Sequence, residues 1–134
     1  MALSVVTLVG GGGAGLVNGV GTNAKFNSPK GFTMSKDKTF LLVADTGNHV
    51  IRHINLATLD VTTVAGDGTS GYGDATVGTS AKFNSPADLG IHPDGSYALI
   101  GDAGNHCIRK LTLHTYEVST YAGTCGQPGH VWVC

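Results

Sequence analysis

The chain contains two copies of one sequence unit. The segment Ala24–Pro29 (AKFNSP) returns unchanged as Ala81–Pro86, 57 residues later. The pattern Asp-x-Gly-Asn-His-x-Ile-Arg begins at Asp45 and, with the same offset, at Asp102. Over the whole of 24–66 and 81–123 the two copies align without a gap, and close to half of the positions are identical. A repeat of this length is a supersecondary unit that buries its apolar face only against a neighbouring copy. We therefore predict an array of repeats.

The composition is that of a folded protein without a strong charge. Of the 134 residues, 41% are hydrophobic and 13% are charged, and the formal net charge is −1. This balance leaves no basic surface for nucleic acid or for an anionic membrane. No apolar run reaches the length of a membrane span. The 21 glycines have no helical context and indicate turns and connections between short strands.

Each repeat contains four short segments of strand character, separated by Gly, Asn, Asp and Pro. The second segment is an almost continuous apolar run, which is typical of an interior strand covered on both faces. In the third segment Ile51 and Ile54 are three residues apart, so its register stays open. No helical periodicity is present. The predicted strands cover 31–35, 39–44, 50–56 and 61–65 in the first copy, and 88–92, 96–101, 107–113 and 118–122 in the second.

Four antiparallel strands per repeat, followed by a long glycine-rich connection, are typical of a β-propeller blade. The sequence also resembles the NHL-repeat family, which is named for an Asn-His-Leu motif. The resemblance lies in Phe-Asn-Ser-Pro, in Leu42–Arg52 and in Val61–Gly66, and Val50 or Cys107 replaces the motif leucine. It implies a six-bladed propeller. The expected fold class is all-β, with two four-stranded antiparallel blades of an NHL-type propeller that is incomplete in this chain.

The repeat also predicts the division of the chain. Residues 6–10 align with 62–66, so we expect 5–9 to be an orphan outer strand. The predicted units are this strand with a glycine-rich connection (1–23), a blade (24–66), a connection (67–80), a second blade (81–123) and a tail outside the repeat (124–134). Two blades cannot close a propeller ring, which usually contains four to eight blades. Either the chain is a piece of a longer propeller, or several copies assemble into one propeller. The orphan strand favours the first alternative, because it would complete a blade whose other strands this sequence lacks.

A polar set recurs in both copies, and it is the most prominent candidate for a site. Asp and Asn next to a tight turn commonly bond to the backbone. A catalytic group is needed once, whereas a hairpin must be held in every blade, so we interpret the set as structural. Each arginine has two candidate partners, the aspartate of its own repeat or a neighbouring blade. The set comprises Asp45, Asn48, His49 and Arg52, and Asp102, Asn105, His106 and Arg109.

Other motifs are weak. Gly10-x-Gly12-x-x-Gly15 matches a dinucleotide fingerprint only formally, because no helix pattern follows it. The two repeated histidines are too few for a metal site, and no catalytic triad or carboxylate pair is placed by spacing. We therefore expect no catalytic residue, no metal site and no cofactor. Cys107, Cys125 and Cys134 are an odd number, which favours ordinary thiols over a bridge between Cys125 and Cys134.

These observations favour a non-catalytic protein-interaction or scaffold module whose variable connections, 16–21 and 67–77, contact a partner protein. The candidate partner-binding residues are Asn18, Asp67, Tyr72 and Asp74, with Tyr72 as the aromatic anchor. Further propeller blades or self-association are the other expected partners. One alternative is part of a metal-dependent enzyme resembling the α-hydroxyglycine amidating lyases, and another is RNA binding, as in the propellers of tripartite-motif proteins. The sequence has no unrepeated cluster of His, Asp and Tyr, which counts against the enzyme. Its near-neutral charge counts against RNA binding.

Overall fold

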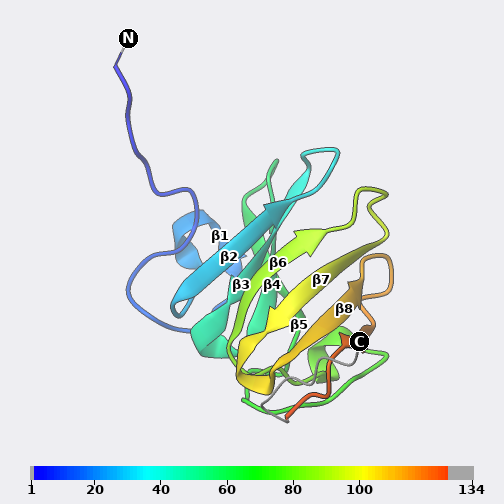
Figure 1. Ribbon diagram of the computed structural model, residues 1–134. Helices are drawn as coiled ribbons and strands as arrows, with labels where there is room; N and C mark the ends of the chain where they lie inside the picture. Colours follow the sequence, from blue (N-terminus) through cyan, green and yellow to red (C-terminus); the bar gives the residue numbers. More distant parts are fainter. Residues whose placement is uncertain (1, 127–134) are drawn as a thin grey trace.

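The structure, a computed structural model, describes residues 2–126 (Figure 1). In this part of the chain there are nine β-strands, four single-turn 3-10 helices and no α-helix, which confirms the all-β fold class. The 3-10 turns are η1 (Gly21–Asn23), η2 (Thr46–Asn48), η3 (Gly78–Ser80) and η4 (Ala103–Asn105). The strands are β1 (Gly19–Val20), β2 (Pro29–Met34), β3 (Phe40–Asp45), β4 (Val50–Asn55), β5 (Asp60–Ala65), β6 (Pro86–Ile91), β7 (Tyr97–Asp102), β8 (Cys107–Thr112) and β9 (Val118–Ala122).

The strands form two antiparallel sheets, and each contains the four strands predicted for one blade. The first sheet has the order β1-β5-β4-β3-β2, and the second has the order β6-β7-β8-β9. Irregularities in register fall at the same places, for example between Ile51 and Arg52 in the first sheet and between Ile108 and Arg109 in the second. The duplicated sequence therefore folds into duplicated blades.

The two-residue strand β1 was not predicted. It pairs with β5, with Gly19 opposite Val61. In the second blade Ala75 occupies the same place and makes a single bridge to Val118. A connection that returns along the outer strand in this way satisfies part of that strand's exposed backbone edge.

The open register of the third strand is explained by burial on both faces. Ile51 packs between the two sheets, whereas Ile54 belongs to a second apolar cluster on the opposite face of the first sheet. Both side chains are almost fully buried. Residues three apart in a strand point to opposite faces, so the period-2 alternation of β4 holds although its hydrophobic pattern does not show it.

The two sheets pack face to face through one apolar layer. The inner strands β2 and β6 lie side by side, as Figure 1 shows. At Gly31 in β2, a Cβ atom would lie 2.7 Å from the Ala87 carbonyl oxygen of β6, so only glycine permits this approach. The layer contains Leu42, Ala44, Ile51, Val64 and Ala65 from the first sheet, with Phe83, Leu89, Ala98, Ile100, Leu111 and Val118 from the second part of the chain.

The outer strand expected over residues 5–9 is not formed in the structure, and its place in a preceding blade stays a prediction. Residues 2–9 carry no strand assignment, and the Val5 side chain is fully exposed. The physical reason is that a strand needs a neighbouring ladder of hydrogen bonds, and no strand of the described residues lies beside this segment (Figure 1).

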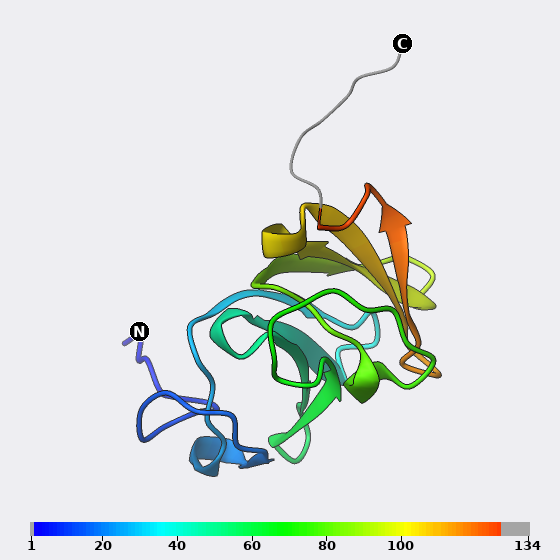
Figure 2. The same ribbon diagram turned by 90° about the horizontal axis from the view of Figure 1, so that it is seen from below.

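The turns η2 and η4 lie at one end of the blades, where the connection between the two sheets also runs (Figure 1). Viewed from below, residues 66–80 cross from the first sheet to the second over this end (Figure 2). The short hairpin turns, such as 35–39 and 92–96, lie at the opposite end. Among residues 2–126, no helix has the length and apolarity needed to cross a membrane.

Candidate functional site at the connection end of the blades

The repeated polar residues are brought together by the turn between the second and third strands of each blade. Asp45 ends β3, the single turn η2 follows, and His49 adopts a left-handed conformation with φ of 59° before β4 begins. His106 repeats this conformation with φ of 60°. Histidine is more common in this region than most residues other than glycine. The tight turn places the aspartate and the arginine on adjacent strands.

In the first blade Asp45 is the central acceptor. Its Oδ1 accepts the backbone N–H of Asn27 at 2.8 Å, and its Oδ2 accepts hydrogen bonds from Asn48 Nδ2 and Arg52 Nη1, both at 2.8 Å. The side chains of Asp45 and Arg52 are fully buried. Of the two partners expected for Arg52, the structure shows the aspartate of its own repeat. Because the carboxylate is surrounded by donors, burying its charge is tolerated.

Arg52 ties the glycine-rich connection to the sheet. Its Nη1 also donates to the Lys25 carbonyl oxygen at 2.8 Å, and its Nη2 donates to the Val17 carbonyl oxygen at 2.8 Å and to Asn18 Oδ1 at 3.0 Å. The guanidinium carbon lies 4.7 Å from the centre of the Phe26 ring, a cation–π arrangement. The planar fork thus holds three points of one loop at once.

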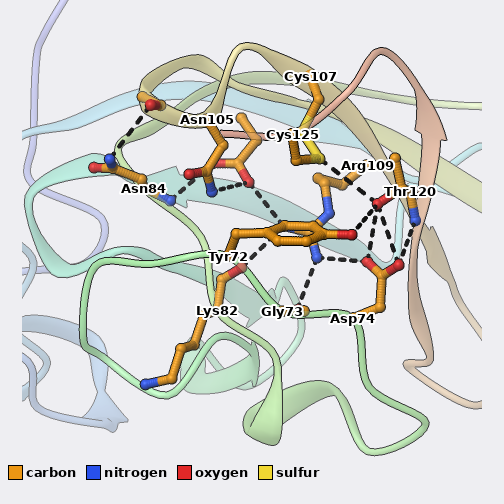
Figure 3. Close-up of a disulfide and its surroundings, with 12 residues drawn as sticks. Tyr72, Gly73, Asp74, Lys82, Asn84, Asn105, Cys107, Arg109, Thr120 and Cys125 are labelled. Atoms are coloured by element: carbon orange, nitrogen blue, oxygen red, sulfur yellow. Dashed lines mark hydrogen bonds and ion pairs between the residues drawn. A yellow bond between two sulfur atoms is a disulfide. The ribbon is translucent and has the colours of Figure 1, made fainter. Parts of the chain in front are cut away.

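The second blade repeats this cluster (Figure 3). Asp102 accepts the Asn84 backbone N–H, Asn105 Nδ2 and Arg109 Nη1, each at 2.8 Å. Arg109 also donates to the carbonyl oxygens of Lys82 at 2.9 Å and of Gly73 at 2.8 Å. These donors and acceptors are used within the molecule in both blades. This geometry supports the structural interpretation of the repeated set.

The two clusters differ in one acceptor. In the second blade Arg109 Nη2 donates to Asp74 Oδ1 at 2.7 Å, where the first blade has the amide oxygen of Asn18. Asp74 also accepts the backbone N–H of Thr120 at 3.1 Å. The sequence predicted both Asn18 and Asp74 as partner-binding residues. In the structure these side-chain oxygens accept hydrogen bonds within their own blades. The signal for this equivalence is the alignment of Gly10 with Gly66, because the first connection is one residue shorter than the second.

The two repeated histidines have different surroundings. His49 Nδ1 accepts the backbone N–H of Ser85 at 3.0 Å, which links the first blade to the second. His106 is exposed at the equivalent place on the second blade. Within residues 2–126, no three side chains of His, Cys, Asp or Glu gather in an arrangement for a metal ion.

Tyr72 and Asp67 keep exposed surface in the second connection. Tyr72 is 50% exposed, although its ring lies 5.1 Å from the Arg109 guanidinium and its hydroxyl is 3.2 Å from Thr120 Oγ1 (Figure 3). Asp67 forms an ion pair with Lys82, with Oδ2 and Nζ 2.6 Å apart. The hydrogen bonds from Lys82 and then from Thr69 lower the pKa of Asp67 to about 2, so it is charged at neutral pH.

The structure contains a disulfide between Cys107 and Cys125, with Cα atoms 5.0 Å apart. The prediction of ordinary thiols was therefore wrong for these two residues, and Cys125 is not free to pair with Cys134, which lies outside the described residues. The two cysteines meet because of the tertiary fold. After β9 the chain turns back over the start of β8, where the Gly126 N–H donates to the Asn105 carbonyl oxygen at 2.7 Å. Val50 stands at the position of Cys107 in the first blade.

A groove of about 480 Å³ lies near the outer strands, lined by several threonines and by His53, Asp60 and Tyr116. Burial lowers the pKa of His53 and raises the pKa of Tyr116. Both shifts favour the uncharged side chain at neutral pH. The groove therefore presents neutral hydrogen-bonding groups beside one carboxylate.

Sequence comparison places these blades among known proteins. No profile of a known protein family matches the chain. NHL repeat-containing protein 2 of Homo sapiens is 38% identical over 105 residues, which are 78% of this chain and 14% of that protein. The chain belongs to the NHL-repeat family. Protein SUPPRESSOR OF QUENCHING 1, chloroplastic, of Arabidopsis thaliana is 37% identical over 111 residues, 81% of this chain and 10% of that protein. This NHL chain thus spans a small part of the curated relatives it matches.

Solved structures give the same result for the fold. The NHL blades are similar to an auxiliary nutrient binding protein from Bacteroides thetaiotaomicron, with a TM-score of 0.67 and 30% identity over 81% of this chain and 26% of that one. A protein of the same description from Bacteroides ovatus also has a TM-score of 0.67, with 26% identity over 82% of this chain and 27% of that one. The two sheets therefore have the arrangement found in larger relatives.

Proposed function

We propose that these NHL repeats form a non-catalytic protein-interaction module that binds a partner protein through the connections 16–21 and 67–77. The observation that carries the proposal is the contact between the two connections. Leu16 Cδ2 lies 3.3 Å from the place that a Cβ atom on Gly68 would occupy. Two segments that are far apart in sequence therefore form one continuous surface at the connection end of the blades.

The exposed side chains of this surface support binding to protein. Leu16 and Val17 are each 43% exposed in the first connection, and Tyr72 is 50% exposed in the second. Val77, at the end of the second connection, is 61% exposed and lines the groove near the outer strands. Aromatic and apolar residues that stay exposed beside polar groups are typical of the anchors of protein interfaces. The Asp67–Lys82 ion pair, which is partly exposed, adds a charged rim to the same surface.

The remaining features of the surface also favour protein over the alternatives. The chain has a formal charge of −1, which gives little attraction for RNA. The buried Asp–Arg clusters use their charged groups internally, so they offer little to a substrate. Propellers host many functions, and the experiment must therefore separate these classes.

A photo-crosslinking side chain placed at Val77 or at Leu16 tests the proposal in extracts of the source organism. The matched control carries the same side chain at Lys36, an exposed residue of the hairpin turn at the opposite end. We expect one discrete crosslinked protein from both connection positions and none from position 36, with less product when Tyr72 is changed to Ser. RNA crosslinks that disappear at high salt would overturn the proposal, as would metal-dependent turnover by the purified chain or identical products from all three positions.

A further inference from the structure

The lysines of the two AKFNSP segments lie in equivalent places. A Cβ atom on Gly15 would lie 3.1 Å from Lys25 Cδ. In the second blade, a Cβ atom on Gly71 would lie 3.2 Å from Lys82 Cδ. The N–H groups of these two glycines also make the same hydrogen bond, each at 3.0 Å to the carbonyl oxygen of the phenylalanine that follows the lysine. Each lysine stem therefore crosses the same part of its connection.

The ammonium groups of the two lysines have different surroundings. Lys82 Nζ donates to Asp67 Oδ2 at 2.6 Å and to Thr69 Oγ1 at 2.7 Å. The first connection has Gly11 at the position of Asp67. Within the part of the chain that the structure describes, the Lys25 ammonium forms no ion pair and donates no side-chain hydrogen bond. Lys25 therefore lacks the carboxylate that its counterpart has.

The backbone of the first connection explains why position 11 has no carboxylate. A Cβ atom on Gly11 would lie 2.9 Å from the Thr22 carbonyl oxygen, and the Gly11 N–H donates to the Ala24 carbonyl oxygen at 3.2 Å. An aspartate there would have to push the backbone aside. The ammonium instead lies beside Gly12, because Lys25 Nζ is 3.8 Å from the place that a Cβ atom on Gly12 would occupy.

The two blades differ in local charge as a result. Each cluster consists of the lysine, the arginine and the carboxylates that pair with them. The first cluster comprises Lys25, Arg52 and Asp45. The second comprises Lys82, Arg109, Asp67, Asp74 and Asp102. Cations are in excess by one in the first cluster, and carboxylates are in excess by one in the second. An uncompensated cation at an exposed loop attracts acidic groups and steers an acidic partner towards it.

The loop beside Lys25 also offers backbone donors. Gly12 and Gly13 are exposed and have φ of 68° and 91°. Their N–H groups donate no backbone hydrogen bond within residues 2–126. A carboxylate has about four lone-pair sites, more than one ammonium group fills. A bound carboxylate can therefore accept hydrogen bonds from this loop in addition to its ion pair with Lys25.

We propose that Lys25 and the glycine-rich loop 10–15 bind a carboxylate of the partner protein, an Asp or Glu side chain that takes the place of Asp67. The loop leads directly into the exposed Leu16, so the partner presents an acidic side chain next to an apolar one. The inference rests on the proposed function, because the loop adjoins the connection 16–21. It adds the chemistry of one contact and the residue that recognises it.

Gly12→Asp and Gly12→Asn form a matched pair of variants. Asp and Asn adopt a left-handed backbone more readily than most residues other than glycine, so the two variants carry the same strain. They differ in charge. Because the Cβ position of Gly12 is 3.8 Å from Lys25 Nζ, the aspartate should fill the site with an internal carboxylate. The asparagine should leave the ammonium available.

The first measurement uses the 134-residue chain without a partner. Sodium acetate is added at constant ionic strength, and the CεH₂ groups of the lysines are followed by NMR. We expect Lys25 to reach half-saturation at a concentration at least about 5-fold lower than Lys36, an exposed lysine of a hairpin turn. Gly12→Asp should abolish this difference, and Gly12→Asn should retain it. Lys82 should respond only when Asp67→Asn removes its own carboxylate.

Two results of this titration would overturn the inference. One is an equal response of Lys25 and Lys36 to acetate. The other is a preference for inorganic phosphate over acetate that is larger at Lys25 than at Lys36, because the site would then be built for a phosphate group.

The second measurement uses the protein captured through the crosslinker at Leu16. A carbodiimide joins an amine to a carboxylate that is already paired with it, forming an amide bond while the lost oxygen leaves in the urea. We expect such a bond between Lys25 and an Asp or Glu of the partner, detected by mass spectrometry. It should form with the parent and with Gly12→Asn and be lost with Gly12→Asp. Capture of a partner without this bond would overturn the inference and leave the proposed function intact. Failure to capture any partner would overturn both.

Discussion

Asp74 Oδ1 accepts a hydrogen bond from Arg109 Nη2 at 2.7 Å, and the same position of the first blade is occupied by Asn18, whose amide oxygen is 3.0 Å from Arg52 Nη2. The buried guanidinium group therefore has a charged acceptor in the second blade and a neutral acceptor at the equivalent place in the first blade. The Asp74 side chain is 39% exposed, so solvent screens part of the attraction.

Asn18→Asp should stabilise the first blade, because it gives Arg52 the carboxylate that Arg109 already has. We expect the free energy of unfolding to rise by up to about 1 kcal/mol at pH 7. The gain should be lost progressively as the pH falls below about 4, the ordinary pKa of aspartate, because pairing with Arg52 would lower the pKa of this residue in the folded chain. Urea unfolding at pH 7 and pH 3 measures the difference. Asp74→Asn is the reciprocal variant, and equal effects of the two substitutions in the same direction would contradict the argument.

Removing one member of the buried Asp45–Arg52 pair should destabilise the chain strongly. Arg52→Met leaves the Asp45 carboxylate buried without its cation and releases the connection at Val17 and Lys25. We expect a loss of about 3–5 kcal/mol in the free energy of unfolding. Lys36→Met removes a positive charge from an exposed turn and should change it by less than about 0.5 kcal/mol. Comparable losses in the two variants would show that the pair contributes little.

The Cys107–Cys125 bridge closes a loop with a sequence separation of 18 and should stabilise the second blade by about 3 kcal/mol. Cys125→Ser removes the bridge, and Cys107→Val removes it while restoring the residue found at position 50. Both variants should lose similar free energy, and a reducing agent should destabilise the parent chain but neither variant. If Cys107→Val were as stable as the oxidised parent, packing at position 107 would matter and the bridge would not.

His53 should make the stability of the chain depend on pH. Burial lowers its pKa below the ordinary value of 6.5, so below that pH the unfolded chain binds a proton that the folded chain does not. This contribution to stability is therefore complete above pH 6.5 and is lost as the pH falls towards the lowered pKa. Thermal unfolding from pH 8 to pH 5 measures it. His53→Phe keeps a ring against Phe40, 4.8 Å away in the parent, and should flatten this part of the profile.

Gly31→Ala should separate the two blades. The added Cβ would lie 2.7 Å from the Ala87 carbonyl oxygen and 2.8 Å from Asp88 Oδ1, and the backbone of β6 must move to accept it. We expect a loss of at least about 2 kcal/mol. Gly90→Ala is the matched control in β6, because nothing lies within 4 Å of its Cβ position. Denaturation curves that coincide for the two variants would contradict the close approach of β2 and β6.

The predicted strands agree with the structure to within about two residues at most boundaries, because turn residues punctuate each repeat. The pairing of Arg52 with Asp45 was one of two alternatives, and the strand spacing alone did not choose between them. The role of Asn18 and Asp74 was missed. Their partners, Arg52 and Arg109, are about 35 residues away in sequence, and no local pattern reports such a contact.

The sequence by itself determined that two equivalent blades form, since the repeat, the turn residues and the strand patterns all agree within each copy. Only the tertiary structure decided why equivalent positions of the two copies have different surroundings. His49 bonds to Ser85 while His106 is exposed, and Leu89 is buried while Phe32 is not. Cys107 likewise meets Cys125 because the chain turns back after β9. In each case the neighbour that supplies the bond or the covering surface comes from a distant part of the chain, so its presence follows from packing and not from local sequence.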